Sequence, residues 1–232
     1  MTVSLHPVPG IPEIRRGDDL PALVAAAVAA AGLGPLPGDV IVVTHKVVSK
    51  AEGMVVGCLD DAEYRRIVAD EAAAVLRRRG DLVIARTRHG YICANAGVDR
   101  SNAAQGTAIL LPRDPDRSAH GIRTGIHRIC GVDCPVVVTD TFGRPWRRGV
   151  VDVAIGVSGL EAILDLRGTP DASGRIMEAT EVAVVDEIAA AADLVMGKAD
   201  AIPAAIVRGL ALAPGAGRAA DLIRPADEDM FR

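Results

Sequence analysis

The stretch DVIVVTHKVVSK, residues 39–50, decides how the surrounding chain is organised. Residues 40–43 are an unbroken run of β-branched side chains, which predicts a short strand buried on both faces. The mostly polar segment THKVVSK, residues 44–50, follows at once, and we predict a turn there, at the point where the strand leaves its sheet. Polar side chains on such connections are the ones that most often contact ligands.

Lysine is rare in this chain, with only Lys46, Lys50 and Lys198 among 26 basic residues. A lysine supplies a compact, flexible positive charge that the planar guanidinium of arginine does not reproduce. All three lysines are predicted to lie in turns beside apolar strands. We therefore treat them as candidate ligand contacts.

A second apolar run, residues 136–138, leads into Thr139, Asp140 and Thr141. In layered sheets, side chains at the C-terminal end of a strand face a crevice outside the sheet, where ligands commonly bind. A carboxylate there could hold Mg²⁺, which keeps few protein ligands and shares the phosphates of its substrate. The alternative is an aspartate that only caps the following turn, and the residues leave both interpretations open.

The remaining elements mix helices with short strands. Hydrophobic spacing predicts helices at residues 20–31, 60–79, 117–129 and 180–196, and strands at residues 82–85, 108–111 and 205–207. The arginines at 77–79 would end the second helix at the negative end of its dipole. Residues 149–165 fit a strand or a helix equally. The mixture favours α+β or α/β layering in a single domain, residues 1–232, with a subdomain break near Arg113.

A polar loop, NAGVDRSN at residues 95–102, carries Asp99, Ser101 and Asn102. Carboxylate, amide and hydroxyl groups gathered on one loop are typical of sites for hard cations and phosphates. The alternative is an Asx-type turn, in which these side chains bind their own backbone.

Composition excludes several classes of function. Aromatic residues make up only 2% and the net charge is −4, which argues against a nucleic-acid-binding protein. No stretch approaches the ~20 apolar residues of a membrane span, and the N-terminus lacks the pattern of a signal peptide. The four cysteines are scattered, which predicts reduced thiols in the cytoplasm.

Other familiar motifs are missing. The sequence contains neither a phosphate-binding P-loop nor a dinucleotide-binding glycine motif. His120, His127, Cys130 and Cys134 match no zinc-binding spacing. The arginines at 144, 147 and 148 are either a clamp for carboxylates and phosphates or ordinary surface charges.

Five segments occur together in one order and carry a resemblance that spans nearly the whole chain. They are residues 10–20 (GIPEI…GDDL), 39–53, 96–102 (AGVDRSN), 139–147 (TDTFGRPWR) and 183–209. Together they resemble the coenzyme F420:L-glutamate ligase family, both its stand-alone form and the N-terminal half of its two-domain actinobacterial form. The chain ends soon after the ligase portion, which implies the stand-alone form without a nitroreductase-like domain and without a flavin site.

The resemblance implies a fold and an activity. The expected fold is α+β, with two intertwined subdomains and mixed sheets, in a homodimer. Members use GTP with Mg²⁺ or Mn²⁺, with potassium as an accessory ion. They join L-glutamate, once or as further γ-linked residues, to the deazaflavin coenzyme precursor F420-0. The implied route is an acyl phosphate, which the amine of glutamate then attacks.

The resemblance also assigns residues. Its nucleotide contacts fall on Ile11, Pro12, Glu13, Ile14, His45, Lys50 and Asn102, and its metal ligands fall on Asp99, Asp140 and Thr141. Lys50 and Asp140 are the expected catalytic residues. His45 departs from the family pattern, in which a small hydroxyl residue is common. A contact through its backbone would survive that change, whereas a side-chain contact would be altered.

Two other functions fit the same residues. One is a metal-dependent phosphatase or nucleotidase that uses Asp99 and Asp140. The other is a nucleotide-binding partner of a separate reductase, without catalysis of its own. A homodimer is expected in addition from the apolar, glycine-rich stretch 149–159, which we interpret as surface buried against a partner.

Overall fold

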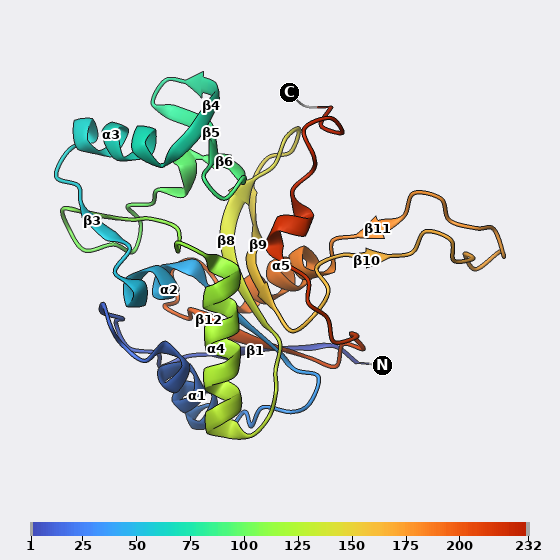
Figure 1. Ribbon diagram of the computed structural model, residues 1–232. Coiled ribbons are helices and arrows are strands. Elements are labelled where there is room, and N and C mark those ends of the chain that lie inside the picture. The colour runs from blue at the N-terminus through green and yellow to red at the C-terminus, as the bar shows by residue number, and fades with distance from the viewer. Residues whose placement is uncertain (1, 231–232) are drawn as a thin grey trace.

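The computed structural model describes residues 2–230 and is built around one five-stranded sheet (Figure 1). Its strands, in spatial order, are β1 (Ser4–Val8), β12 (Ala204–Arg208), β2 (Val40–Thr44), β8 (Val136–Gly143) and β9 (Val150–Ser158). Only the central pair, β2 and β8, is parallel. The predicted α+β class with mixed sheets is confirmed.

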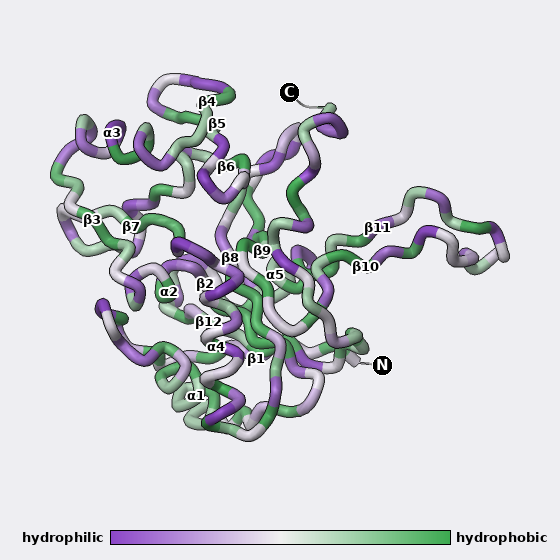
Figure 2. The backbone as a smooth tube through the Cα atoms, in the orientation of Figure 1, coloured by the Kyte–Doolittle hydropathy of each residue, from purple (hydrophilic) through white to green (hydrophobic). Residues whose placement is uncertain are grey.

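Helices cover both faces of this sheet. Helices α1 (Leu20–Ala30) and α4 (Pro115–Cys130) pack on one face, and α5 (Val184–Met196) packs on the other. Ile41 and Val43 belong to the first core, and Val40 and Val42 belong to the second. The run of residues 40–43 is apolar throughout because its alternating side chains enter two different cores. Figure 2 shows this apolar character gathered on the central strands.

The turn predicted at residues 44–50 is wrong, because residues 45–52 form the helix α2 (His45–Glu52). The helix starts directly after β2 and ends at Gly53, whose φ of 73° is in the left-handed region that glycine adopts readily. Val47 and Val48 are buried in the core, while the lysines of this segment lie on the opposite side. Lys46 and Lys50 therefore project from a rigid helix.

A small subdomain is inserted between α2 and α4 and has its own core (Figure 1). It contains the paired strands β3 (Val55–Gly57) and β7 (Thr107–Ile109), the helix α3 (Asp61–Glu71), the sheet of β4 (Ala72–Arg79), β5 (Leu82–Thr87) and β6 (Ile92–Ala94), and the 3₁₀ turn η1 (Asn95–Gly97). Beyond β7, the chain returns to the main sheet through α4.

The predicted helix at residues 60–79 is correct only in its first half. From Ala72 to Arg79 the chain is a strand, β4, which pairs with β5 through Arg79 and Leu82. The arginines at 77–79 therefore lie beside a hairpin tip and do not cap a helix. Residues in this segment have good helix propensity, but pairing with β5 overrides a preference of that size.

Residues 149–165, which fitted a strand or a helix, contain the strand β9. Its residues 154–158 are buried between α4 and α5. A Cβ atom at Gly156 would overlap the carbonyl group of Pro115, so glycine is needed where α4 crosses the strand. Most of the stretch 149–159 is thus internal to one chain, and our interpretation of it as a partner surface is wrong.

Residues 164–182 form an arm that projects from the body of the molecule (Figure 1). Its base is the two-stranded pair β10 (Leu164–Asp165) and β11 (Glu181–Val182). Near the C-terminus, the 3₁₀ turn η2 (Ala219–Leu222) covers part of the core beside α5. Among residues 2–230, no helix is long and apolar enough to cross a membrane.

Candidate functional site

Two of the predicted residues, His45 and Asp140, meet where β2 stops and β8 continues. Thr44, the last residue of β2, pairs with Thr139, while β8 extends four residues further along β9. The site residues 139–141 therefore lie within a strand, although we expected them just after one. His45, at the start of α2, lies next to Asp140.

His45 and Asp140 form the first contact of the site. The side chain of His45 is only 1% exposed, and its Nε2 atom lies 3.2 Å from Oδ1 of Asp140. The same carboxylate oxygen accepts a hydrogen bond of 2.7 Å from the backbone N–H of Thr141. On the other side of the ring, Nδ1 lies 3.4 Å from Oγ of the buried Ser49.

Lys46 makes the second contact, with Asp99 on the loop after η1. Nζ of Lys46 lies 2.8 Å from Oδ2 of Asp99 and donates to Oγ of Ser101 at 2.6 Å. Burial by itself raises the pKa of Asp99. Hydrogen bonds from Lys46 and Ser101 outweigh that effect and hold this pKa below its usual value.

The loop also has the geometry of the turn that we weighed as an alternative. The backbone N–H of Ser101 donates to Oδ1 of Asp99 at 2.6 Å, so Asp99 binds its own backbone as well as Lys46. Asn102 is exposed in the same turn, with a φ of 55°. Oδ2 of Asp99 accepts a hydrogen bond from the Ser101 hydroxyl and also contacts Lys46, so the turn and the lysine contact occur together.

Lys50 makes the third contact, with Glu13 of the N-terminal segment. Its Nζ lies 2.6 Å from Oε1 of Glu13, and the Lys50 side chain is 13% exposed. Ile14 is buried in the main core, whereas Pro12 and Glu13 are exposed. Burial of Ile14 fixes the segment against α2, and any ligand contact by Ile14 has to come from its backbone.

Three side chains of one helix thus reach three separate segments. We call the residues His45, Lys46 and Lys50, with their partners Asp140, Asp99 and Glu13, the α2 site.

Cys93 on β6 lies close enough to Asp140 for the charge of this carboxylate to affect the pKa of its thiol. Burial, and secondly this carboxylate, raise the pKa of the Cys93 thiol to about 12, so it stays protonated.

Thr141 lies apart from the α2 site, on the other face of the sheet. Consecutive residues of a strand point to opposite faces, so Thr141 and Asp140 diverge. The Thr141 hydroxyl donates to Oδ1 of Asp152 at 2.6 Å, and Lys198 donates to the hydroxyl at 2.5 Å. The three predicted metal ligands are not brought together into one donor set.

A second polar network surrounds Asp152, which we did not predict as a site residue. Its side chain is 4% exposed and accepts hydrogen bonds from Thr139, Thr141 and Lys198. Nζ of Lys198 also lies 2.9 Å from Asp193. Burial lowers the pKa of Lys198, but the hydrogen bonds to Asp152 and Asp193 raise it by more. The rarity of lysine was the sequence signal that pointed to this network.

The donor atoms suit a hard cation that brings other ligands with it. Residues 2–230 contain no group of three or more His, Cys, Asp or Glu side chains able to hold a metal ion, and this includes His120, His127, Cys130 and Cys134. Mg²⁺ and Mn²⁺ need fewer protein ligands when a nucleotide phosphate and water complete the shell. Asp140, beside a buried ring nitrogen that has no hydrogen bond, fits such an ion.

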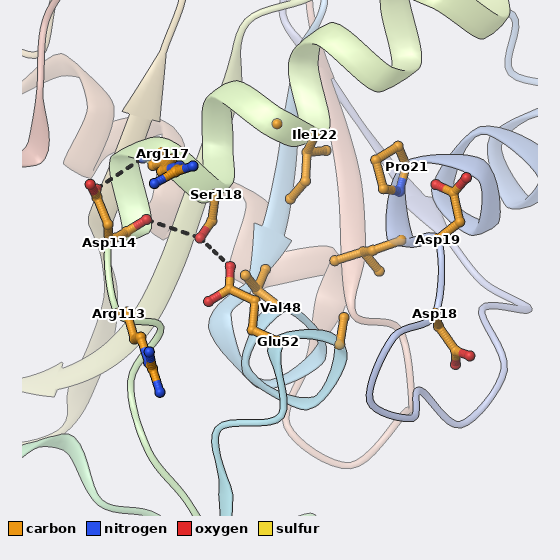
Figure 3. Close-up of a pocket in the computed structure, with 13 residues that line it drawn as sticks. Asp18, Asp19, Pro21, Val48, Glu52, Arg113, Asp114, Arg117, Ser118 and Ile122 are labelled. Atoms are coloured by element: carbon orange, nitrogen blue, oxygen red, sulfur yellow. Dashed lines mark hydrogen bonds between the residues drawn. The ribbon is translucent and has the colours of Figure 1, made fainter.

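One cavity lies between the start of α1, the helix α2 and the helix α4 (Figure 3). It measures about 560 Å³ and is lined by Glu52, Arg113, Arg117, Ser118 and residues at the start of α1. Ser118 donates to Glu52 across it. None of the predicted nucleotide or metal residues lines this cavity.

A smaller cavity of about 260 Å³ adjoins the end of β8, with Tyr91 and Phe142 in its wall. The rings of Tyr91 and Phe142 meet edge to face, with centroids 6.3 Å apart. Beyond it, the arginines 144, 147 and 148 lie on a loop, where Arg144 donates to the backbone of Arg148 at 3.4 Å. Among residues 2–230, no hydrogen bond or ion pair joins these arginines to the α2 site.

Known proteins resemble this chain over its whole length. Residues 10–209 match the family described as F420-0:Gamma-glutamyl ligase. The chain is 41% identical to the coenzyme F420:L-glutamate ligase of Methanothermobacter thermautotrophicus, with 100% of each chain covered. It is 42% identical to the protein of that name from Methanopyrus kandleri, over 100% of this chain and 98% of the relative. The Methanocaldococcus jannaschii protein is 41% identical over 84% of this chain and 85% of its own.

Proposed function

The chain belongs to the F420-0:gamma-glutamyl ligase family, and from this premise we propose that it joins L-glutamate to the deazaflavin precursor F420-0, using GTP and Mg²⁺ or Mn²⁺. One observation supports the nucleotide and metal parts above all others. A single helix, α2, brings two lysines and a histidine against three carboxylates from separate segments. Such convergent charge is what phosphoryl transfer needs.

The reaction must activate a carboxylate, because an amide does not form from a carboxylate and an amine in water without it. A carboxylate oxygen of the precursor attacks the γ-phosphorus of GTP, and the bond to the β–γ bridging oxygen breaks to release GDP. The amine of glutamate then attacks the acyl carbon, loses a proton and displaces phosphate. One F420-0, one glutamate and one GTP give the amide, GDP and phosphate.

The residues of the α2 site have distinct tasks in this proposal. Asp99 and Asp140 would hold the divalent ion, which neutralises charge on the phosphate oxygens. When GTP binds, the ammonium group of Lys50 leaves Glu13 and contacts a phosphate oxygen. The ammonium group of Lys46 leaves Asp99 and contacts a phosphate oxygen in the same way. The backbone of residues 11–14 and Asn102 would flank the nucleotide. Potassium is an accessory ion with no residue assigned to it.

The proposal is tested by incubating the protein with GTP, Mn²⁺, L-glutamate and F420-0, followed by mass spectrometry. A mass gain equal to one or more glutamate residues, matched by release of GDP, is expected. Phosphate release without glutamate addition would identify a phosphatase or nucleotidase instead. Binding of GTP without turnover would identify a nucleotide-binding partner protein.

Lys50 should not tolerate replacement by arginine. The substitution keeps the charge, but the planar guanidinium cannot take the place of a compact ammonium between Glu13 and a phosphate. We expect Lys50→Arg to lower kcat/KM for GTP at least tenfold, or about 1.4 kcal/mol of transition-state stabilisation. Steady-state kinetics measure this, with Arg65→Lys at the exposed Asp81 pair as the control. If Lys50→Arg has wild-type kinetics, Lys50 is only a surface charge and does not contact the phosphate of GTP.

We further propose that the active form is a homodimer. Two observations support a partner surface: the projecting arm, and the exposed apolar side chains Leu164 and Ile176 that it carries. Isolated arms of this kind bury little surface of their own, and two-fold closure is the commonest arrangement of soluble oligomers. Light scattering at micromolar concentration should give about twice the 24.0 kDa of one chain. A fully active protein at the mass of one chain would rule the dimer out.

The cytoplasm is the compartment that we propose for the reaction. All four cysteines are free thiols, and three of them are buried. Unpaired cysteines are the usual state in a reducing compartment.

A further inference from the structure

The imidazole of His45 has one nitrogen that the protein leaves without a hydrogen bond. Its Nε2 atom is buried and has no hydrogen-bond partner, and the whole side chain is only 1% exposed. A buried polar atom in this state costs about 1–3 kcal/mol, so it calls for a ligand or another explanation. The atom faces Oδ1 of Asp140 at 3.2 Å.

The separation of these two atoms suits two ligands of one metal ion. Donors at about 2.1 Å from an ion, in adjacent octahedral positions, lie about 3.0 Å from each other. The contact does not have the geometry of a hydrogen bond, since Nε2 of His45 has no hydrogen-bond partner. The separation of 3.2 Å is thus close to that of two ligands of one cation, and no hydrogen bond joins the two atoms.

The surroundings of the ring also suit a metal ligand. Nδ1 of His45 lies 3.4 Å from Oγ of Ser49, one helical turn further along α2, and Ser49 is fully buried. A histidine that ligates through Nε2 usually donates from Nδ1 to a neighbouring acceptor, which fixes its tautomer and orientation. Ser49 is in position to be that acceptor.

We propose that His45, through Nε2, is a ligand together with Asp140 of the divalent ion. This inference rests on the proposed metal dependence and adds the class of ion to it. Imidazole nitrogen binds Mn²⁺, Co²⁺ and other transition ions in preference to Mg²⁺, which favours oxygen. The site is thereby biased toward transition ions.

The direct test is electron spin echo envelope modulation of Mn²⁺ bound to the protein, with no nucleotide present. The expected spectrum shows coupling to an imidazole nitrogen, which changes when all histidines carry ¹⁵N. The coupling should disappear in His45→Asn, since asparagine reproduces the Nδ1 side of the ring but has no atom at Nε2. It should persist in His120→Asn, a control at an exposed position of α4. Bound Mn²⁺ without nitrogen coupling, or no bound Mn²⁺ at millimolar concentration, overturns the proposal.

Metal affinities give a second readout that does not depend on spectroscopy. Titration calorimetry should show at least a tenfold loss of Co²⁺ affinity in His45→Asn, with Mg²⁺ affinity changed less than about threefold. Equal losses for both ions would mean that the substitution disturbs the site in general, and the proposal would fail. Neither measurement uses glutamate or F420-0. A protein that binds Mn²⁺ through His45 but does not ligate glutamate would contradict only the proposed function.

Discussion

Replacement of Asp140 by asparagine is expected to abolish ligation and leave the fold intact. A neutral amide is a far weaker ligand for a hard divalent cation than a carboxylate. The amide oxygen can still accept the hydrogen bond from the N–H of Thr141, so the strand geometry survives. We expect kcat to fall at least about a thousandfold, the upper range for removing one electrostatic contribution to a transition state. Product formation by mass spectrometry measures the loss.

The control for this substitution is Asp133→Asn. Asp133 is half-exposed, follows the C-terminal end of α4 and pairs with Arg123 of that helix, away from the α2 site. It should keep wild-type turnover. The melting temperatures of both variants should stay close to that of the wild type. Near-normal turnover of Asp140→Asn at the same metal concentration would remove Asp140 from the metal site.

The second large effect is on stability and concerns Asp152. Its Oδ1 atom accepts from Thr141 at 2.6 Å and from Lys198 at 2.7 Å, and its Oδ2 atom accepts from Thr139 at 2.9 Å. Asparagine would put an NH₂ group against at least one of these donors. The buried hydrogen bond is then lost, and a buried donor is left without an acceptor.

We expect Asp152→Asn to lower the free energy of unfolding by about 3 kcal/mol. The share of Lys198 in this figure is small, because its side chain is 52% exposed and keeps the contact with Asp193. For a chain of this length, the change corresponds to a fall in Tm of about 6–12 °C. Thermal and urea unfolding, followed by circular dichroism, measure it.

The matching control is Asp165→Asn on the projecting arm. Asp165 also accepts hydrogen bonds from a basic residue, Arg167, but it is exposed at the base of the arm. Its replacement should leave Tm unchanged within error, because solvent replaces the lost contact. An equal Tm for Asp152→Asn and the wild type would show that the Asp152 network contributes nothing to stability.

Local sequence was enough to predict the central part of the fold. Residues 40–43 and 136–138 are apolar without alternation, which indicated two strands buried on both faces, and both lie at the centre of the sheet. The sequence indicated a helix at residues 180–196 for the same kind of reason, and the structure has one at Val184–Met196. These patterns are readable because burial of each side chain depends mainly on its own position in a repeating element.

The candidate site could be predicted as a set of residues but not as an arrangement. The order of the five segments pointed to the family, and the loop with Asp99 and the strand with Asp140 were noticed on their chemistry alone. That α2 joins these two segments depends on the parallel pairing of β2 and β8. Such contacts link residues some 50 to 100 positions apart, and no local pattern encodes them.

Sequence by itself therefore determined the α+β class, the buried central strands and the family. Only the tertiary structure decided that residues 45–52 are a helix, that residues 72–79 are a strand, and that Thr141 faces Asp152 while Asp140 faces His45. The physical reason is the same in each case. Local preferences of a few tenths of a kcal/mol per residue yield to pairing and packing with distant parts of the chain. Neighbouring side chains of a strand also point to opposite faces of the sheet. The local sequence does not indicate which distant residues they contact there.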